Sequence, residues 1–542
     1  MLALADFMDS LLRGAVLASL ALVLGSVAWA LWVLRVPRER PPALATDRCL
    51  TLLGTGGVAL ALGQICLLAL KARVLSESLG RSALGDFADT THFHAGAARV
   101  LLALAVAGAA VALRRRPGGR GRWTLMVALA GLLAASGAWL THAAGRLEDR
   151  PLLMTLTLLH QASAAIWVGG LMQLGGLWRL ARRHAEIDAL WPEMVGRFSR
   201  LALASVIVLV LGALPLTWTY TGSIDGLVGT GYGSLVVTKV MLLAMALLLA
   251  AFNFGVARGA REPRPAALRT RLPHLAEAEA IILVMILVAA TALSAQPPPA
   301  DQSRAEQATA GEVAEVFRPK LPSLRTPSVD VMREQRAGVV EKRERSREAY
   351  LWSNFSHNVA GLILLGMSLV ALGGLIARAG WSRHWPLGFV VLAAFIYLRA
   401  AANEGTWPFG STPLWQLDAE GLQHRLAAVL VLALGGLEWR ARSGQRPGTL
   451  LPYVFPALAA VGAVLLLTHS HAAFQLKSSF LVQVTHTTMG ALAALLAAAR
   501  WLDLRLAPPW RRVAEGAAST AMLLIALVLV FYREANVLIP PE

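Results

Sequence analysis

The chain contains about fourteen apolar runs, each roughly 17 to 25 residues long, and these runs limit the folds that it can adopt. An α-helix of that length crosses a hydrocarbon core about 30 Å thick. Segments in lipid must satisfy their own backbone hydrogen bonds, and the runs lack the alternation of barrel strands, so each is expected to be a helix. The expected spans are approximately 12–34, 50–70, 94–113, 123–143, 152–178, 201–219, 234–257, 277–295, 353–377, 385–400, 423–439, 451–471, 484–502 and 514–532.

The composition indicates the same class of protein. Hydrophobic residues make up 56% of the chain and charged residues 15%, a balance typical of membrane proteins rather than soluble domains. The sequence therefore predicts an all-α, polytopic integral membrane bundle of about fourteen transmembrane helices in contact with lipid.

The arginines predict the orientation, because loops rich in Lys and Arg stay on the cytoplasmic side. Basic loops follow the odd-numbered spans, whereas the loops at 220–233 and 401–422 carry no Lys or Arg. Both termini are therefore expected to face the periplasm. The net charge of +17 is dispersed over the inside loops instead of forming one basic face, so nucleic acid is not an expected partner. The basic loops are residues 35–48, 114–122, 179–200, 258–271, 378–383, 440–446 and 505–512.

A polar segment interrupts the apolar pattern between Gln296 and Tyr350. It divides the chain into a membrane domain at 1–296 with about eight helices, a periplasmic linker at 297–350, and a membrane domain at 351–542 with about six helices. Prolines in the first part of the linker favour an extended course, and the mixed-charge residues 333–348 predict a short surface helix.

Most of the twelve histidines are expected at or near the outer ends of the spans. One histidine in a membrane helix is usually a hydrogen-bonding residue, but a set at one level favours a metal site that faces outward. Imidazole is a common ligand of copper, zinc, iron and nickel. The tightest local group is THSH at 468–471 followed by His486. The predicted ligands are His92, His94, His142, His160, His357, His424, His469, His471 and His486.

Other residue types add less to this prediction. Met154, within two turns of His160, is the best placed thioether to assist a soft ion. Gly169 and Gly176 are expected to permit close approach of helices. Carboxylates are sparse within the spans, and each lies near enough to a predicted inner end to be solvated: they are Glu277, Glu279, Glu438 and Asp503.

Two motifs carry a resemblance to a known family. Residues 160–170, HQASAAIWVGG, resemble the His-to-Trp-Gly-Gly signature of the copper resistance protein D family. Residues 221–253, with Tyr232, Gly233, Lys239 and Asn253, are similar to that family's Tyr-Gly-x-x-Leu-x-x-Lys region. This resemblance covers about 1–300. The second half, with NFSHNVAGL, LQHR, THSHA and THTTMGALAALLAAARWLDLRL, is similar to a C-terminal membrane portion fused to some members.

The resemblance implies a multi-pass protein of the bacterial inner membrane that moves copper from the periplasm to the cytoplasm. The cargo is Cu(I) or Cu(II), and a separate periplasmic copper carrier protein is the implied partner. A transporter is expected rather than an enzyme. Neutral imidazole binds metal, so uptake should weaken as the pH falls through about 6.5, the ordinary histidine pKa.

Two alternatives use the same histidines. Paired histidines on facing helices can hold haem, which would make the protein a membrane oxidoreductase of the cupric reductase type. Haem ligation favours histidines at two depths, whereas most of these lie at one predicted level. The other alternative is an assembly factor for a copper oxidase, which would bind a protein partner stably.

Overall fold

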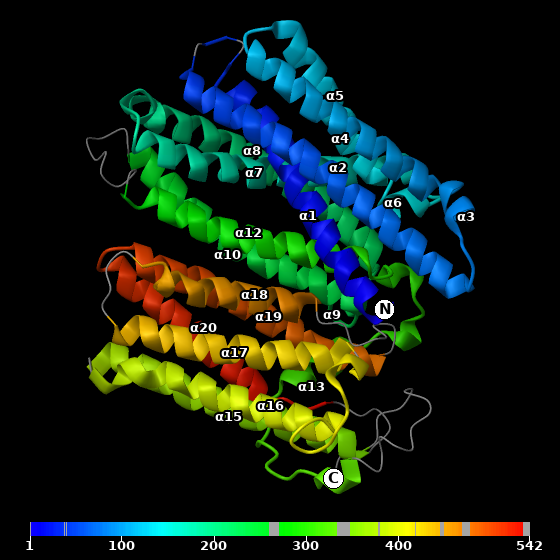
Figure 1. Ribbon diagram of the computed structural model, residues 1–542, viewed down its shortest axis with the longest axis vertical. Coiled ribbons are helices and arrows are strands. Elements are labelled where there is room, and N and C mark those ends of the chain that lie inside the picture. The colour runs from blue at the N-terminus through cyan, green and yellow to red at the C-terminus, as the bar shows by residue number, and fades with distance from the viewer. Residues whose placement is uncertain are drawn as a thin grey trace. The chain divides into compact units, whose positions relative to one another are not determined.

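The computed structural model describes residues 2–36, 38–39, 41–259, 270–332, 347–377, 380–417, 419–444, 449–468 and 477–534 (Figure 1). These residues form helices and no strands. Thirteen helices among them are long and apolar enough to cross a membrane. The predicted all-α membrane fold is therefore confirmed, while the orientation of the termini stays a prediction.

The chain divides into two compact units. Unit 1 contains Met1–Tyr220 and Ala246–Ala295, and unit 2 contains Thr221–Met245 and Gln296–Glu542. Helix α10 (Gly231–Gly259) contributes to both. The structure groups residues 221–245 with unit 2, whereas the predicted domains group them with the N-terminal membrane domain. The division into two membrane domains and a linker stays a prediction.

Unit 1 is built around its first helix, α1 (Leu2–Ala28), which continues into a π-helical turn, η1 (Trp29–Val33), and packs on α2, α5, α7 and α12. The other long helices are α2 (Ala43–Leu79), α4 (Thr91–Arg115), α5 (Arg120–Ala138), α7 (Arg150–Ala181), α8 (Ala185–Thr221) and α12 (Leu272–Ser294). The short helices are α3 (Leu84–Ala88) and α6 (His142–Gly145).

Two adjacent glycines of α7 let two different helices approach it. A Cβ at Gly169 would overlap the carbonyl oxygen of Ala21 on α1 and lie 2.9 Å from the Cα of Gly25. A Cβ at Gly170 would overlap the ring of Phe198 on α8. Gly176, the other glycine predicted to serve helix contact, makes room for the Arg48 side chain instead. Small residues thus fix the spacing of α1, α7 and α8.

Unit 2 has one strongly buried helix, α19 (Lys477–Arg505), which packs on α18 and α20. Its other helices are α9 (Ile224–Val228), α13 (Ala310–Phe317), α15 (Arg347–Ala377), α16 (Gly388–Glu404), α17 (Ala419–Ser443), α18 (Val454–Thr468) and α20 (Trp510–Val530). Short 3-10 turns are η2 (Pro299–Asp301), η3 (Arg304–Glu306), η4 (Gly380–Leu387), η5 (Leu414–Gln416) and η6 (Leu451–Tyr453).

The linker is tied to unit 2 by a short helix that the sequence did not predict. Helix α13 begins with a capping box at Thr309 and contacts α9 and α19. The Nζ of Lys477 lies 2.6 Å from a carboxylate oxygen of Glu312. After α13 the chain runs without helix through 318–328, as the prolines predict. Most of the predicted surface helix at 333–348 lies outside the described residues.

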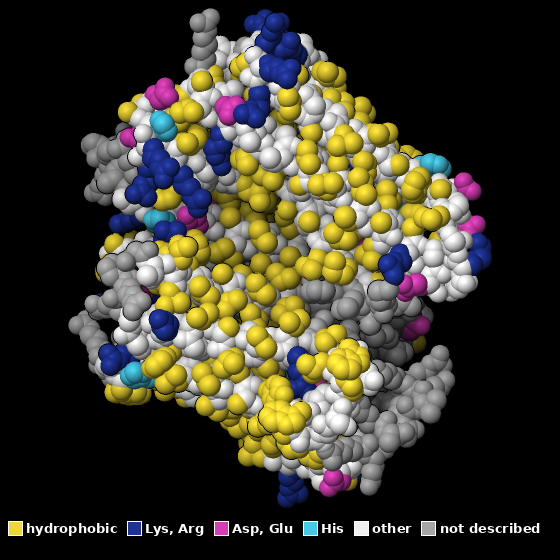
Figure 2. All heavy atoms as spheres, in the orientation of Figure 1, with side chains coloured by type: hydrophobic (Ala, Val, Ile, Leu, Met, Phe, Trp, Pro, Cys, Tyr) yellow, Lys and Arg dark blue, Asp and Glu magenta, His cyan; other side chains and the backbone are white. Residues whose placement is uncertain are grey.

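The surface agrees with a membrane location. Large apolar side chains on the helices are exposed, among them Leu211, Leu214 and Trp218 on α8. Figure 2 shows apolar side chains covering the lengths of the helices on the face in view. Exposing this apolar surface to water would be energetically unfavourable, whereas contact with lipid acyl chains carries no such cost.

The fourth and the eleventh predicted spans differ from the structure in ways that concern the candidate residues. The fourth ends at Ala138, so His142 belongs to the separate helix α6. The eleventh, α17, is a helix of 25 residues but is not among the thirteen apolar ones. Polar residues at both ends of α17 explain this: Arg425 pairs with Glu404 at 2.7 Å, and Glu438 with Arg500 at 2.8 Å.

The prediction that the inner carboxylates are solvated is wrong for three of them. Glu279 is 3% exposed, and Glu438 and Asp503 are each 1% exposed. Neighbouring helices cover these residues, and depth along a single helix does not reveal such cover. In unit 2 the buried acids join an ion network at the ends of three helices: Glu438 and Arg442 of α17, Arg500 and Asp503 of α19, and Arg511 and Glu515 of α20.

Candidate functional site

In unit 2 the motif NFSHN on α15 holds the chain that follows α20. The Nδ2 of Asn358 donates to the carbonyl oxygens of Leu529 and Tyr532, each at 3.0 Å. The amide nitrogen of Glu534 donates to Asn354 Oδ1 at 2.9 Å. A Cβ at Gly361 would lie 2.5 Å from the backbone nitrogen of Val530. These contacts fix the position of the tyrosine ring at 532.

That ring covers a pair of histidines from two helices. Tyr532 stacks on His357 of α15 with ring centroids 4.0 Å apart. The rings of His357 and His486, the latter on α19, have centroids 5.8 Å apart and stand at 90°. His486 is 8% exposed. The Tyr532 hydroxyl donates to Glu534 at 3.0 Å. The structure thus brings two of the predicted ligands into one cluster.

Each histidine of this pair contacts its own helix through Nδ1. The partner of His357 Nδ1 is the Ser353 carbonyl oxygen at 2.9 Å, and that of His486 Nδ1 is the Val482 carbonyl oxygen at 3.1 Å. A carbonyl oxygen only accepts, so in the neutral rings Nδ1 carries the proton and Nε2 carries the lone pair. Histidines that bind metals are usually held in this way.

The other predicted ligands of unit 2 are His424, His469 and His471. His424 lies near the start of α17, next to Arg425. His469 and His471 lie outside the described residues, between the end of α18 at Thr468 and the start of α19 at Lys477. Their role stays a prediction.

In unit 1 the predicted ligands are spread over several places. His92 and His94 lie in the first turn of α4, next to the rings of Phe87 and Phe93. His142 faces Tyr220 with ring centroids 6.5 Å apart. On α7, the Nδ1 of His160 lies 3.1 Å from the Leu209 carbonyl oxygen of α8, and Met154 is partly buried. Across the described part of the chain no three His, Cys, Asp or Glu side chains form a metal-binding group.

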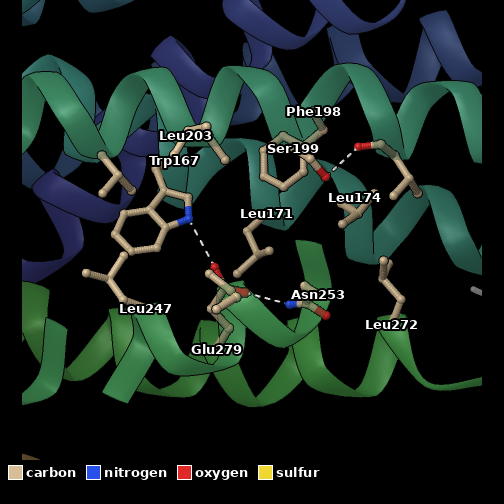
Figure 3. A pocket seen from close by; sticks show the side chains of 15 residues that line it. Trp167, Leu171, Leu174, Phe198, Ser199, Leu203, Leu247, Asn253, Leu272 and Glu279 are labelled. Carbon is tan, nitrogen blue, oxygen red and sulfur yellow. Dashed lines mark hydrogen bonds between the residues drawn. The ribbon is translucent and has the colours of Figure 1, made fainter. Parts of the chain in front are cut away.

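A second site in unit 1 was not predicted as one. Glu279 of α12 accepts from Trp167 Nε1 at 3.0 Å and from Asn253 Nδ2 at 2.8 Å. Figure 3 shows Trp167 and Asn253 directed toward the same carboxylate from different helices. The Glu279 carboxylate borders a cavity of about 260 Å³ between α7, α8, α10 and α12, and the walls of this cavity include Leu171 and Leu203. The sequence feature that could have indicated this site is an ionisable residue, Glu279, within an apolar run.

Two family models match mainly unit 1. Residues 192–293 match the copper resistance protein D family, and residues 4–149 match the copper resistance protein D-like N-terminal domain. These two matches place the similarity to the copper resistance protein D family in the N-terminal half of the chain. The resemblance stated from the sequence is confirmed. Within this copper resistance protein D region, Asn253 and Glu279 lie in a matched range, Trp167 lies between the two ranges, and His357 lies beyond both.

One curated relative is the copper transport protein CutJ of Bacillus subtilis (strain 168), which is 33% identical over 201 residues. The aligned part is 37% of this chain and 35% of CutJ, so the chain spans about a third of the length of the relative that it matches. No solved structure matches the chain significantly. The similarity to the family models therefore lies in the N-terminal half, and unit 2 adds the histidine pair.

Proposed function

We propose that this protein transports copper across the bacterial inner membrane, from the periplasm to the cytoplasm, and that outward-facing histidines receive the ion. The family of the N-terminal half and the printed name of its relative CutJ support copper as the cargo. The single observation that carries the proposal for this chain is the pair His357 and His486.

The geometry of the pair suits one ion between two imidazoles. Metal–imidazole distances are about 2.0–2.1 Å, so two rings on one ion have centroids about 5–6 Å apart. The separation here is 5.8 Å. Both Nδ1 atoms face carbonyl oxygens, which in the neutral rings leaves Nε2 as the nitrogen that would bind the metal. Imidazole accepts copper in either oxidation state.

Further ligands are proposed from the histidine set. His469 and His471 precede α19, the helix that carries His486, and His424 belongs to the same unit. In unit 1 we propose that His160 receives copper with help from Met154, and that His92, His94 and His142 lie on the approach. A periplasmic copper carrier is the proposed donor.

Alanine in place of His357 or His486 is expected to remove the ion held by this pair. Copper affinity should fall at least about tenfold, because even residues that only support metal ligands change affinity by 10–100-fold. The measurement is copper bound per purified protein, together with copper uptake by cells. His384→Ala is the matched control, since His384 contacts Trp439 and lies at a predicted inner end.

The outcomes separate the proposal from its alternatives. Copper binding and uptake that stay at wild-type level in both variants would contradict it. A Soret absorption band that disappears in the same variants would support the haem oxidoreductase instead. Copper that reaches a stably bound oxidase subunit, with no net uptake, would support the assembly factor. Tyr532→Phe keeps the stacked ring, so it should bind copper nearly as well as the wild type.

A further inference from the structure

We propose that Glu279 and Asn253 form a binding site for a monovalent cation, a proton or Na⁺, whose movement is coupled to that of copper. The inference rests on the proposed function, because it concerns what drives the transport. It adds a second ion and a second site, in unit 1, to the copper-binding histidines.

The first reason is the charge of Glu279. A carboxylate buried in a membrane protein is costly unless a positive charge accompanies it. The hydrogen bonds to Glu279 come from two neutral groups, the Trp167 indole and the Asn253 amide. Among the described residues that line the cavity, Glu279 is the charged one.

Among the described residues, no Lys or Arg side chain on a neighbouring element forms an ion pair with the Glu279 carboxylate. On α1, which packs on α12, Arg13 contacts Ser294, fifteen residues further along α12 than Glu279 and so about 22 Å away. On α12 itself, Glu277 contacts the His274 ring at 3.3 Å. The lining residues from α7 and α8 include Trp167 and Ser199 as their polar members.

The second reason is an excess of acceptor atoms. Asn253 uses its Nδ2 to donate to Glu279, and its Oδ1 is buried with no hydrogen-bond partner in the described structure. The side-chain oxygens of Glu279 and Asn253 are therefore gathered with fewer donors than they can accept. Carboxylate and amide oxygens suit protons and hard cations, whereas copper prefers imidazole and thioether ligands. The chemistry of this site thus differs from that of the histidine sites.

The third reason is the position of the cavity. Its volume of about 260 Å³ accommodates several water molecules, which a hydrated cation needs on its way to the carboxylate. Trp167 follows His160 by seven residues on α7, so the two side chains share one face about 10 Å apart. On α8, Val206 lines the cavity one turn before Leu209, whose carbonyl oxygen contacts His160. His160, the proposed copper ligand, and the proposed cation site therefore both lie along the interface between α7 and α8.

The test uses purified full-length protein in liposomes, with copper uptake measured under an imposed proton gradient, an imposed Na⁺ gradient, or neither. A pH step of one unit is a tenfold concentration ratio, which can change copper accumulation by up to about tenfold for each coupled proton. The wild type is expected to respond to one of the two gradients, and that response identifies the cation. Glu279→Gln should abolish the response while copper affinity at equilibrium stays within about twofold.

Glu279→Gln is expected to fold, because its amide can accept from Trp167 and donate to Asn253 Oδ1. Glu277→Gln is the matched control on the same helix and should keep the gradient response. Wild-type uptake that ignores both gradients, or Glu279→Gln uptake that follows a gradient as the wild type does, would overturn the inference and leave the copper transporter intact. A wild type that takes up no copper under any condition would instead overturn the proposed function.

Discussion

Alanine at Gly169 is expected to prevent normal folding of unit 1. The added Cβ overlaps the carbonyl oxygen of Ala21 and lies 2.9 Å from the Cα of Gly25, so it meets backbone atoms that no rotamer change can move. Overpacking typically costs about 1–3 kcal/mol and more where the surroundings are rigid. Helix α1 must shift to relieve the clash, and with it the contacts that α1 makes to α2 and α12.

The matched control lies on the same helix. A Cβ at Gly175 meets nothing within 4 Å, so Gly175→Ala should be neutral or slightly stabilising. The measurement is the yield of monodisperse protein in detergent and its melting temperature by tryptophan fluorescence. Gly25→Ala should resemble Gly169→Ala, because its Cβ would overlap the Cα of Gly169. Equal yields and melting temperatures for Gly169→Ala and Gly175→Ala would show that α1 and α7 are not held at this contact.

The same few residues show what the motif at 160–170 does. Trp167 binds the buried Glu279, Gly169 admits α1, and Gly170 admits α8. The sequence predicted close helix contact at Gly169 correctly. It could not predict that the adjacent glycine serves a different helix, because that depends on which neighbours face each side of α7.

The spans were predictable because each depends on local composition. An apolar run of sufficient length has few alternatives to a membrane helix, and the composition of α17 still predicted a helix although its polar ends lower its hydropathy. Exact ends were less predictable. Helix α8 begins at Ala185, well before the apolar run at 201–219, because its first turns are polar but still helical.

The candidate sites were predictable only in part. Counting residues along a helix indicates the depth of a histidine but not its neighbours, so the count predicted one level for His357 and His486 without pairing them. The sequence did not indicate a role for Tyr532 and Glu534. They follow the last helix, and only the folded chain brings them to the histidine pair. Glu279 was placed near the surface by the same depth count, and the packing of α7, α8 and α10 buries it.

The ion network of unit 2 gives the other large expected effect. Glu438 is fully covered, and its Oε1 lies 2.6 Å from Arg442 and 2.8 Å from Arg500. The three acids and three arginines of the network balance in charge. Glu438→Gln removes one negative charge and leaves three arginines with the two remaining acids. Removing one partner of a buried pair typically costs about 3–5 kcal/mol, so a large fall in melting temperature is expected.

Restoring the balance should recover part of that loss. In the double variant Glu438→Gln with Arg442→Gln, two acids face two arginines, so the destabilisation should be smaller than the sum of the single effects. Glu315→Gln is the surface control, because Glu315 pairs with Arg318 and Lys320 in the open, and no measurable change is expected. Strictly additive effects in the double variant would mean that the charges act singly. In that case apolar packing alone would hold α17 in position, and the ion pairs that its two ends form with α16 and α19 would not act together.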